Sequence, residues 1–312
     1  MVENAIEVRN LTKRYNGTPA VDLLGFTVKR GTAFGFLGPN GAGKTTTIKM
    51  LVGLIRPDSG TAIVAGHDIL GEPMAVRRSI GVVQENQGFY SRMTATETLE
   101  YLGRLLDVPI NKRRKRLGEL LDWAGLADRR DSYVGTFSHG MKQRLALAQA
   151  LLAEPEVLIL DEPMIGLDPM GAKEIRDLIV KLKQDRTVTI FMSSHILPDV
   201  EAVCDAVGII NHGRLLAQDS VDNLRRTTGG GMTVEVILAQ PDAQVVKALQ
   251  EMNCIQEVEA EGQRLIIRTT DREEVRPQII ESIIKARGQV LLFGKKEASL
   301  EEILLRVVEE GK

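Results

Sequence analysis

The sequence predicts an α/β fold with a mainly parallel core sheet, followed by a small α+β domain. Three nearly continuous apolar runs, at 156–163, 187–195 and 206–219, indicate parallel strands that helices bury on both faces. Three successive glycines within 227–232 then indicate a flexible connector or a tight turn. Beyond this break, strand and helix patterns follow one another in the order β-α-β-β-α-β, the split-βαβ or ferredoxin-like pattern.

These observations place the first domain at 1–228 and the second at 232–312. The first domain begins with short strands, for which we expect the ranges 5–11, 23–31, 33–39 and 61–66, with a helix at 44–55. Its middle part, about 88–155, has helical periodicity, with helices expected at 94–108, at 112–126 and after Ser138.

The second domain is expected to contain two helices and four strands, two of them in a hairpin. The strands are expected at 232–239, 255–270 (the hairpin) and 289–295, and the helices at 242–252 and 272–288. A last amphipathic helix is expected at 299–310. We expect that helix to pack on its own domain; a dimerisation surface is the alternative.

The composition is that of an ordinary globular protein. Of 312 residues, 43% are hydrophobic and 26% charged, and the net charge of −2 gives no sign of a nucleic-acid-binding tail. The two cysteines, Cys204 and Cys254, are isolated, which favours buried reduced thiols and a cytosolic protein. Neither a signal-peptide core nor a stretch of roughly 20 apolar residues occurs, so any membrane role is expected to require a partner.

The stretch GPNGAGKTT matches the pattern G-x-x-x-x-G-K-[ST] between a strand and a helix. Glycines let the backbone curl so that several N–H groups point at one phosphate, and the helix N-terminus adds positive potential. Lys44 is expected to reach the β and γ phosphates, and the Thr45 hydroxyl to hold Mg²⁺. The expected nucleotide-binding residues here are Gly38, Pro39, Asn40, Gly41, Ala42, Gly43, Lys44, Thr45 and Thr46.

Two acids end the apolar run VLILDEP. Asp161 falls at the carboxyl end of a buried strand, where an α/β sheet places its ligand residues, and we expect it to hold the Mg²⁺ shell. Its neighbour Glu162 is expected to point the other way and to orient or deprotonate the attacking water. These two motifs together predict a P-loop nucleotide triphosphatase.

The stretch that begins at Ser138 narrows this prediction. Ser-His-Gly-Met followed by KQRLALAQALL resembles the signature helix of ATP-binding cassette (ABC) ATPases, whose usual text is Leu-Ser-Gly-Gly-Gln followed by Gln-Arg and an Ala-rich helix. The residues that match are Ser138, Gly140, Gln143 and Arg144, and those that depart are Phe137, His139 and Met141. The resemblance implies that Ser138 and Gly140 contact the ATP of a second subunit.

Four more residues match marks of the same family, in the family's order, within about 5–215. The resemblance implies that Tyr15 stacks on adenine and that Gln84 touches Mg²⁺ and the attacking water. It also implies that Asp168, in the loop after the second acid motif, is among the nucleotide-binding residues and that His195 holds the γ-phosphate. Glu162, His195 and Gln84 are the implied catalytic residues, and Thr45, Gln84 and Asp161 the implied metal ligands.

The resemblance also implies an architecture and a mechanism. The cassette would combine the core sheet with an antiparallel N-terminal β subdomain and the inserted helical subdomain. Two copies would close head-to-tail on two ATP molecules, with Mg²⁺, and drive a separately encoded integral-membrane permease. Together with the C-terminal extension, the form SHGMKQR looks like exporters of drugs, antibiotics, polysaccharides or sodium. The chain would then be cytoplasmic and peripheral at the inner face of the membrane, with no nucleic-acid partner.

Two other classes of function remain open at this point. One is a permease-free ABC ATPase of an assembly or nucleic-acid-related machine, and the other is a P-loop kinase or transferase, which would not need the signature. For His139 we expect a tolerated subclass variant, with a pH-sensitive contact to the partner's nucleotide as the alternative. The basic run 112–116 is expected to be a solvated helix face rather than a lipid or RNA contact. His67 and His212 match no motif and are expected to be structural.

Overall fold

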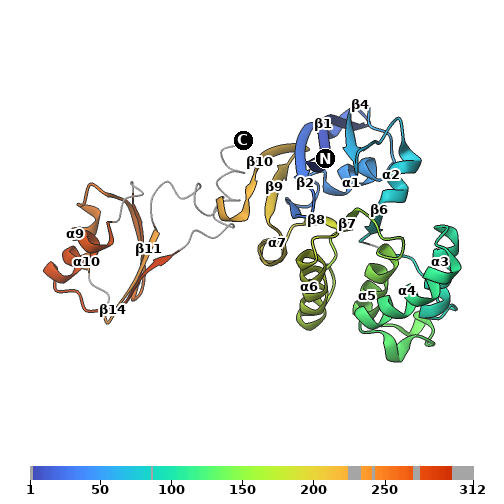
Figure 1. Cartoon of the computed structure of the whole chain (residues 1–312). Coiled ribbons are helices and arrows are strands. Elements are labelled where there is room, and N and C mark those ends of the chain that lie inside the picture. The colour runs from blue at the N-terminus through green and yellow to red at the C-terminus, as the bar shows by residue number, and fades with distance from the viewer. Residues whose placement is uncertain (1–2, 86, 224–232, 241–242, 270–274, 297–312) are drawn as a thin grey trace. The chain divides into compact units, whose positions relative to one another are not determined.

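The structure, a computed structural model, divides the chain into two compact units, Met1–Val221 and Asp222–Lys312 (Figure 1). It describes residues 3–85, 87–223, 233–240, 243–269 and 275–296. The connector expected at 227–232 and the helix expected at 299–310 lie outside these residues. No helix in the described ranges is both long and apolar enough to cross a membrane.

An antiparallel sheet with strand order β2-β1-β4-β5 opens the first unit. Its strands are β1 (Asn4–Tyr15), β2 (Thr18–Lys29), β4 (Ser59–Val64) and β5 (His67–Asp68). The turn between β1 and β2 is Asn16-Gly17, with φ of 50° and 83°. Two successive left-handed residues match the twist of a hairpin, which explains why Asn-Gly stands here.

The second sheet of this unit has six strands in the order β10-β9-β3-β8-β7-β6. Its strands are β3 (Ala33–Leu37), β6 (Ile80–Val83), β7 (Val157–Asp161), β8 (Thr189–Ser194), β9 (Ala206–Asn211) and β10 (Arg214–Ser220). The pairs from β6 to β9 are parallel, and β3, β7 and β8 are buried along their whole length.

The run 206–219 is a hairpin rather than one strand of the parallel sheet. Its second half, β10, pairs antiparallel with β9 at the edge of the sheet. The turn is His212-Gly213, with φ of 46° and 78°, so the chain reverses at a second pair of left-handed residues. Its apolar character concealed this turn, because both halves of the hairpin carry apolar residues.

Four of the seven phenylalanines pack against one another between the two sheets. Phe26 comes from β2, Phe34 and Phe36 from β3, and Phe191 from β8, with ring centroids 5.2 to 5.8 Å apart. Aromatic rings at such separations add dispersion and quadrupole attraction to the burial of apolar area. These four rings therefore pack where the two sheets meet, on and around β3.

Helices surround the six-stranded sheet and form a separate group beside it. The helices near the sheets are α1 (Lys44–Leu51), α2 (Pro73–Ser79), α6 (Pro169–Gln184) and α7 (Leu197–Val203). The separate group, which Figure 1 shows away from the antiparallel sheet, contains α3 (Ala95–Leu105), α4 (Ile110–Trp123), η1 (Ala127–Arg129), η2 (Val134–Thr136) and α5 (His139–Ala150). A capping box of Thr94 and Glu97 sets the start of α3.

The basic run 112–116 is not the wholly solvated face that the sequence predicts. Arg113 on α4 is only 7% exposed, and its guanidinium donates to the Glu100 carboxylate at 3.0 Å and to the Val108 carbonyl at 2.9 Å. Arg116 donates to the Leu151 carbonyl at 3.3 Å. Two of the five basic residues therefore join α4 to neighbouring segments, because a long apolar stem can be buried while its charge is paired.

The second unit contains an antiparallel sheet with strand order β12-β13-β11-β14. Its elements are β11 (Thr233–Leu238), α9 (Ala243–Gln250), β12 (Ile255–Glu261), β13 (Arg264–Thr269), α10 (Arg276–Lys285) and β14 (Val290–Lys296). Alternate residues of β11 and β13 are buried in one core with α9 and α10, as in the cluster of Val234, Val236, Ile267 and Ile283. The unit therefore has a core of its own.

Both cysteine thiols are free, as the sequence predicts. Cys204, after α7, is buried, whereas Cys254 is only half-buried. Burial raises the pKa of the Cys204 thiol far above its usual range, so this sulfur stays a protonated, apolar packing group.

Candidate nucleotide-binding site

The loop from Gly38 to Thr46 joins the carboxyl end of β3 to the start of α1. A Cβ at Gly38 would lie 2.3 Å from the Ile210 carbonyl oxygen, and one at Gly43 would lie 2.5 Å from the Ala20 carbonyl oxygen. Gly43 also has φ of 106°, a conformation that other residues rarely adopt. Glycine is therefore required at both positions, so that the backbone can curl tightly before the helix begins.

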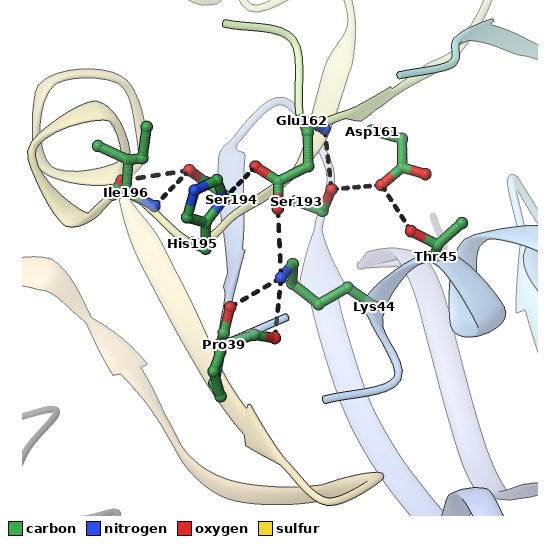
Figure 2. A network of polar contacts seen from close by, with 10 residues as sticks. Pro39, Lys44, Thr45, Asp161, Glu162, Ser193, Ser194, His195 and Ile196 are labelled. Atoms are coloured by element: carbon green, nitrogen blue, oxygen red, sulfur yellow. Dashed lines mark hydrogen bonds and ion pairs between the residues drawn. The ribbon is translucent and has the colours of Figure 1, made fainter. Parts of the chain in front are cut away.

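Lys44, the first residue of α1, is directed into the unit rather than into solvent. It is 6% exposed, and its Nζ donates to the carbonyls of Gly38 at 2.7 Å and Pro39 at 3.2 Å (Figure 2). The same ammonium lies 3.2 Å from Glu162 Oε1. The loop thus folds around a buried positive charge at its own carboxyl end.

Asp161 ends β7, and its carboxylate faces the start of α1. Its Oδ1 lies 3.5 Å from the Thr45 hydroxyl and accepts a hydrogen bond of 2.6 Å from the Ser193 hydroxyl. Ser193 is opposite Asp161 in the register of β7 and β8 and is fully buried. Its oxygen also accepts from the Glu162 backbone N–H at 3.0 Å, so a single hydroxyl fixes both acids (Figure 2).

The sequence reasoning missed Ser193. The signal that could have found it is a small hydroxyl residue near the carboxyl end of the strand 187–195, at the edge where neighbouring parallel strands place their ligand residues. Register between strands was required to pair it with Asp161, and register is a property of the folded sheet.

The carboxylate of Glu162 turns away from that of Asp161. Glu162 has a left-handed backbone, with φ of 50°, which re-aims the chain as it leaves β7. Its Oε2 lies 2.9 Å from His195 Nδ1, and its Oε1 lies next to Lys44. Because Glu162 is only 7% exposed, its carboxylate is largely shielded from solvent and lies between the Lys44 ammonium and the His195 imidazole.

The charges of this cluster fit a hard cation together with a polyanion. One buried ammonium, Lys44, lies next to the buried Glu162 carboxylate, and a second buried carboxylate, Asp161, faces Thr45. Among the described residues, no three acidic, His or Cys side chains gather to hold a metal by themselves. Mg²⁺ is commonly bound by one or two carboxylates plus substrate phosphates, so the Thr45 hydroxyl and the Asp161 carboxylate suit that ion when phosphates supply further ligands.

Three other residues expected at the site stand apart from this cluster. Tyr15 ends β1 with 47% of its surface exposed, and Lys13 Nζ lies 5.9 Å from its ring centroid. Gln84 is exposed just after β6. Asp168 caps α6, where its carboxylate accepts from the Gly171 N–H at 3.3 Å. No hydrogen bond among the described residues joins any of the three to Lys44 or the two acids.

The predicted signature residues form the start of α5, where Ser138 and His139 are exposed and Gly140 is half-buried. Ser138 is the N-cap, and its hydroxyl accepts from the Met141 N–H at 3.2 Å. Across the described ranges, neither Ser138 nor Gly140 is hydrogen-bonded to Lys44, Asp161 or Glu162. The first N–H groups of a helix carry positive potential, so this end of α5 is suited to an anion held by another molecule.

Comparisons with known proteins agree with this geometry. The sequence model of the family described as "ABC transporter" matches residues 21–165. The bacitracin transport ATP-binding protein BcrA of Bacillus licheniformis is 39% identical over 307 residues, which cover 98% of this chain and 98% of that protein. The daunorubicin/doxorubicin resistance ATP-binding protein DrrA of Streptomyces peucetius is 36% identical, over 96% of this chain and 91% of that one.

A solved structure shares the fold of the first unit. The protein cbiO1 of Clostridium perfringens, described as part of the ABC transporter complex cbiONQ, is 31% identical, with a TM-score of 0.66. The match covers 72% of this chain and 92% of that one. With a P-loop, two acids at the end of β7 and relatives that match nearly its whole length, the chain belongs to the ABC transporter family, as an ATP-binding subunit with ATPase activity.

Proposed function

We propose that this chain is the ATPase subunit of an exporter and drives a separately encoded integral-membrane permease. The chain itself would be peripheral, at the inner face of the membrane. The observation that carries the ATPase part is the cluster in which buried Glu162 contacts buried Lys44 and half-buried His195. Ser193 joins this cluster to the buried Asp161 carboxylate. The exporter part is supported by relatives named for bacitracin transport and daunorubicin/doxorubicin resistance, which match this chain beyond its first unit.

In this proposal the phosphate-binding loop binds the phosphates of ATP. The N–H groups of the loop and the start of α1 bind the phosphates, and the Lys44 ammonium pairs with the β and γ phosphates. Exposed Tyr15 offers its ring to adenine. Thr45, Asp161 and Gln84 would hold Mg²⁺, which neutralises phosphate charge as it develops during transfer.

Glu162 is proposed to orient and deprotonate the water that attacks the γ-phosphate. His195 Nδ1 lies 2.9 Å from Oε2 and gives the carboxylate a defined direction, while the Lys44 ammonium, 3.2 Å from Oε1, would turn to the phosphates when ATP binds. His195 fixes Glu162 through Nδ1, and its other nitrogen is proposed to hold the γ-phosphate. The proton taken from water would pass to the Glu162–His195 pair.

A second copy is proposed to complete each site. The exposed Ser138 hydroxyl and the Gly140 N–H of one copy would meet the γ-phosphate bound by the other, with Asp168 at the interface. Closure on ATP and opening after hydrolysis would then be transmitted to the permease. We assign residues 1–228 to the nucleotide-binding domain, with the helical subdomain at about 88–155.

Residues 232–312 are proposed to form an accessory domain of the ferredoxin-like type. The support is the element order β11-α9-β12-β13-α10-β14, the strand order β12-β13-β11-β14 and the helices packed on one core.

The experiment is purification of the tagged full chain from solubilised membranes of its source, with Mg²⁺ and ATP. We expect a protein with several membrane spans to co-purify and, after joint reconstitution into liposomes, to raise the ATPase rate of this chain. Co-purification of only water-soluble assembly proteins or of nucleic acid, without any polytopic partner, would instead favour the permease-free machine.

A further inference from the structure

We propose that His139 is a positioning residue that ties the start of α5 to the turn 162–168 of the same chain. Its Nε2 lies 3.2 Å from the Ile165 carbonyl oxygen, so that an Nε2–H donates a hydrogen bond across 26 positions of sequence. This inference rests on the proposed role of Glu162 in hydrolysis, because that residue begins the tied turn.

The packing around this bond places the ring directly on the turn. A Cβ built on Gly166 would lie 3.5 Å from His139 Nε2, and one built on Gly140 would lie 3.9 Å from Leu167 Cδ2. Two successive residues at the start of α5 therefore face three successive residues of the turn. Gly166 has φ of 71°, a conformation that leaves its Cα open to the imidazole.

The turn is fixed at both ends and needs a link in its middle. At its beginning, Glu162 is held by Ser193, and the Ile165 N–H donates to the Glu162 carbonyl at 3.1 Å. At its end, Asp168 caps α6. In the described part of the chain, His139 makes the only hydrogen bond found to the Ile165 carbonyl, while the preceding residue, Met164, is held by burial of its side chain.

The hydrogen bond to the Ile165 carbonyl gives a physical reason for histidine at position 139, where the usual signature has glycine. A glycine has no side chain to reach Ile165, whereas the imidazole reaches it from the first turn of the helix. Both the neutral Nε2–H tautomer and the imidazolium donate from Nε2, so the link does not require a charge. The imidazole thus serves its own chain's turn, while Ser138 beside it remains exposed.

The consequence is a direct connection between the two halves of the proposed dimer site. Ser138 and Gly140 are proposed to meet the ATP of the partner copy, and the turn carries Glu162 and Asp168 of this copy. A shift of the α5 start on the partner's ATP therefore moves the carbonyl that sets the course of the chain between Glu162 and Asp168. Without the link, the P-loop is unchanged but Glu162 is held less firmly.

The test compares His139→Leu, His139→Gly and His139→Gln in the full chain, with His67→Leu as the matched control. Gln can present a side-chain N–H at nearly the position of Nε2, and Leu fills space without a donor. His67 lies in β5, in the antiparallel sheet, with its Nδ1 3.3 Å from Glu72 Oε1. We expect kcat for ATP hydrolysis to fall about three- to tenfold for Leu and Gly, since a neutral hydrogen bond contributes that much, with KM for ATP within about twofold. His139→Gln and His67→Leu should keep about half or more of the wild-type kcat.

A second readout follows the turn itself. Hydrogen exchange of the amides of residues 164–168 should accelerate in His139→Leu and stay near wild type in His139→Gln. Wild-type kcat in His139→Leu, or equal losses in Leu and Gln, would overturn the proposal. A raised KM with unchanged kcat would also overturn it, because the imidazole would then act on nucleotide. Glu162→Gln separates the two hypotheses: if it hydrolyses ATP normally, the proposed role of Glu162 fails, whatever His139 does.

Discussion

Lys44, Asp161 and Glu162 are buried, with Glu162 next to Lys44 and joined to Asp161 through Ser193. Ser138 and Gly140, in contrast, lie at the start of α5 without hydrogen bonds to these three in the described residues. Burial and mutual contact make the first group a site that one chain assembles alone. Ser138 is exposed and Gly140 half-buried, so the second group is accessible to another molecule. We propose from this difference that one copy supplies the chemistry and a second copy supplies closure.

The largest expected effect tests the chemistry of the buried group. Glu162→Gln keeps the size and the Ser193 contact of the backbone N–H but removes the basic carboxylate, so we expect the ATPase rate to fall about a thousandfold while ATP still binds. Phosphate release measures the rate, and size-exclusion chromatography with ATP measures the trapped dimer.

The control for this variant is Glu156→Gln, at the opposite end of the same strand. Glu156 is exposed and paired with Arg30 at 2.6 Å, so its substitution should leave hydrolysis unchanged. Normal hydrolysis by Glu162→Gln would remove that residue from the chemistry and weaken the distinction between the two groups.

Complementation tests whether the two groups act in different copies. Lys44→Met and Ser138→Arg should each reduce hydrolysis about a hundredfold, because the first disables the P-loop and the second the opposing surface. A mixture of the two should regain up to about a quarter of the wild-type rate, since half of the dimers would contain one intact composite site in a head-to-tail arrangement. A mixture as inactive as its components would place both groups on one ATP in one chain.

Ser193→Ala tests how the buried group is held. We expect kcat to fall about tenfold with little change in KM for ATP, because the hydroxyl fixes both Asp161 and the Glu162 backbone. The matched control is Thr189→Val, which removes another buried hydroxyl from β8, one that accepts from the Gly31 N–H at 3.0 Å. Both variants should lose about 1–3 kcal/mol in the free energy of unfolding, but only Ser193→Ala should lose turnover. Equal kcat in the two variants would make Ser193 merely structural.

The smallest expected effect concerns Tyr15. Like Ser138 it is exposed, but it is proposed to contact the ATP bound by its own copy rather than that of the partner. Tyr15→Leu should raise KM for ATP about fivefold through lost ring stacking and leave kcat unchanged. Tyr15→Phe keeps the ring and should behave as wild type. A loss of kcat in Tyr15→Leu would show that this residue does more than bind the base.

The residues of the P-loop and of the second acid motif were predictable because their chemistry is encoded locally. Gly38 and Gly43 are required by close approach and by positive φ, and Asp161 follows an apolar run that only a buried strand explains. The presence of strands in the N-terminal part and of helices in the middle part was also predictable from the spacing of apolar residues. The hairpin of β9 and β10 was not, because its apolar pattern continues through the turn.

The sequence by itself determined the family and predicted the phosphate loop, the two acids and the signature, since each motif depends on residues that are neighbours along the chain. Only the tertiary structure decided the contacts between distant segments. These contacts are Ser193 with Asp161, the Glu162 oxygens with Lys44 and His195, Arg113 with Glu100, and His139 with Ile165. Such contacts depend on strand register and on helix packing. These are set by the whole core, so no local pattern can specify them.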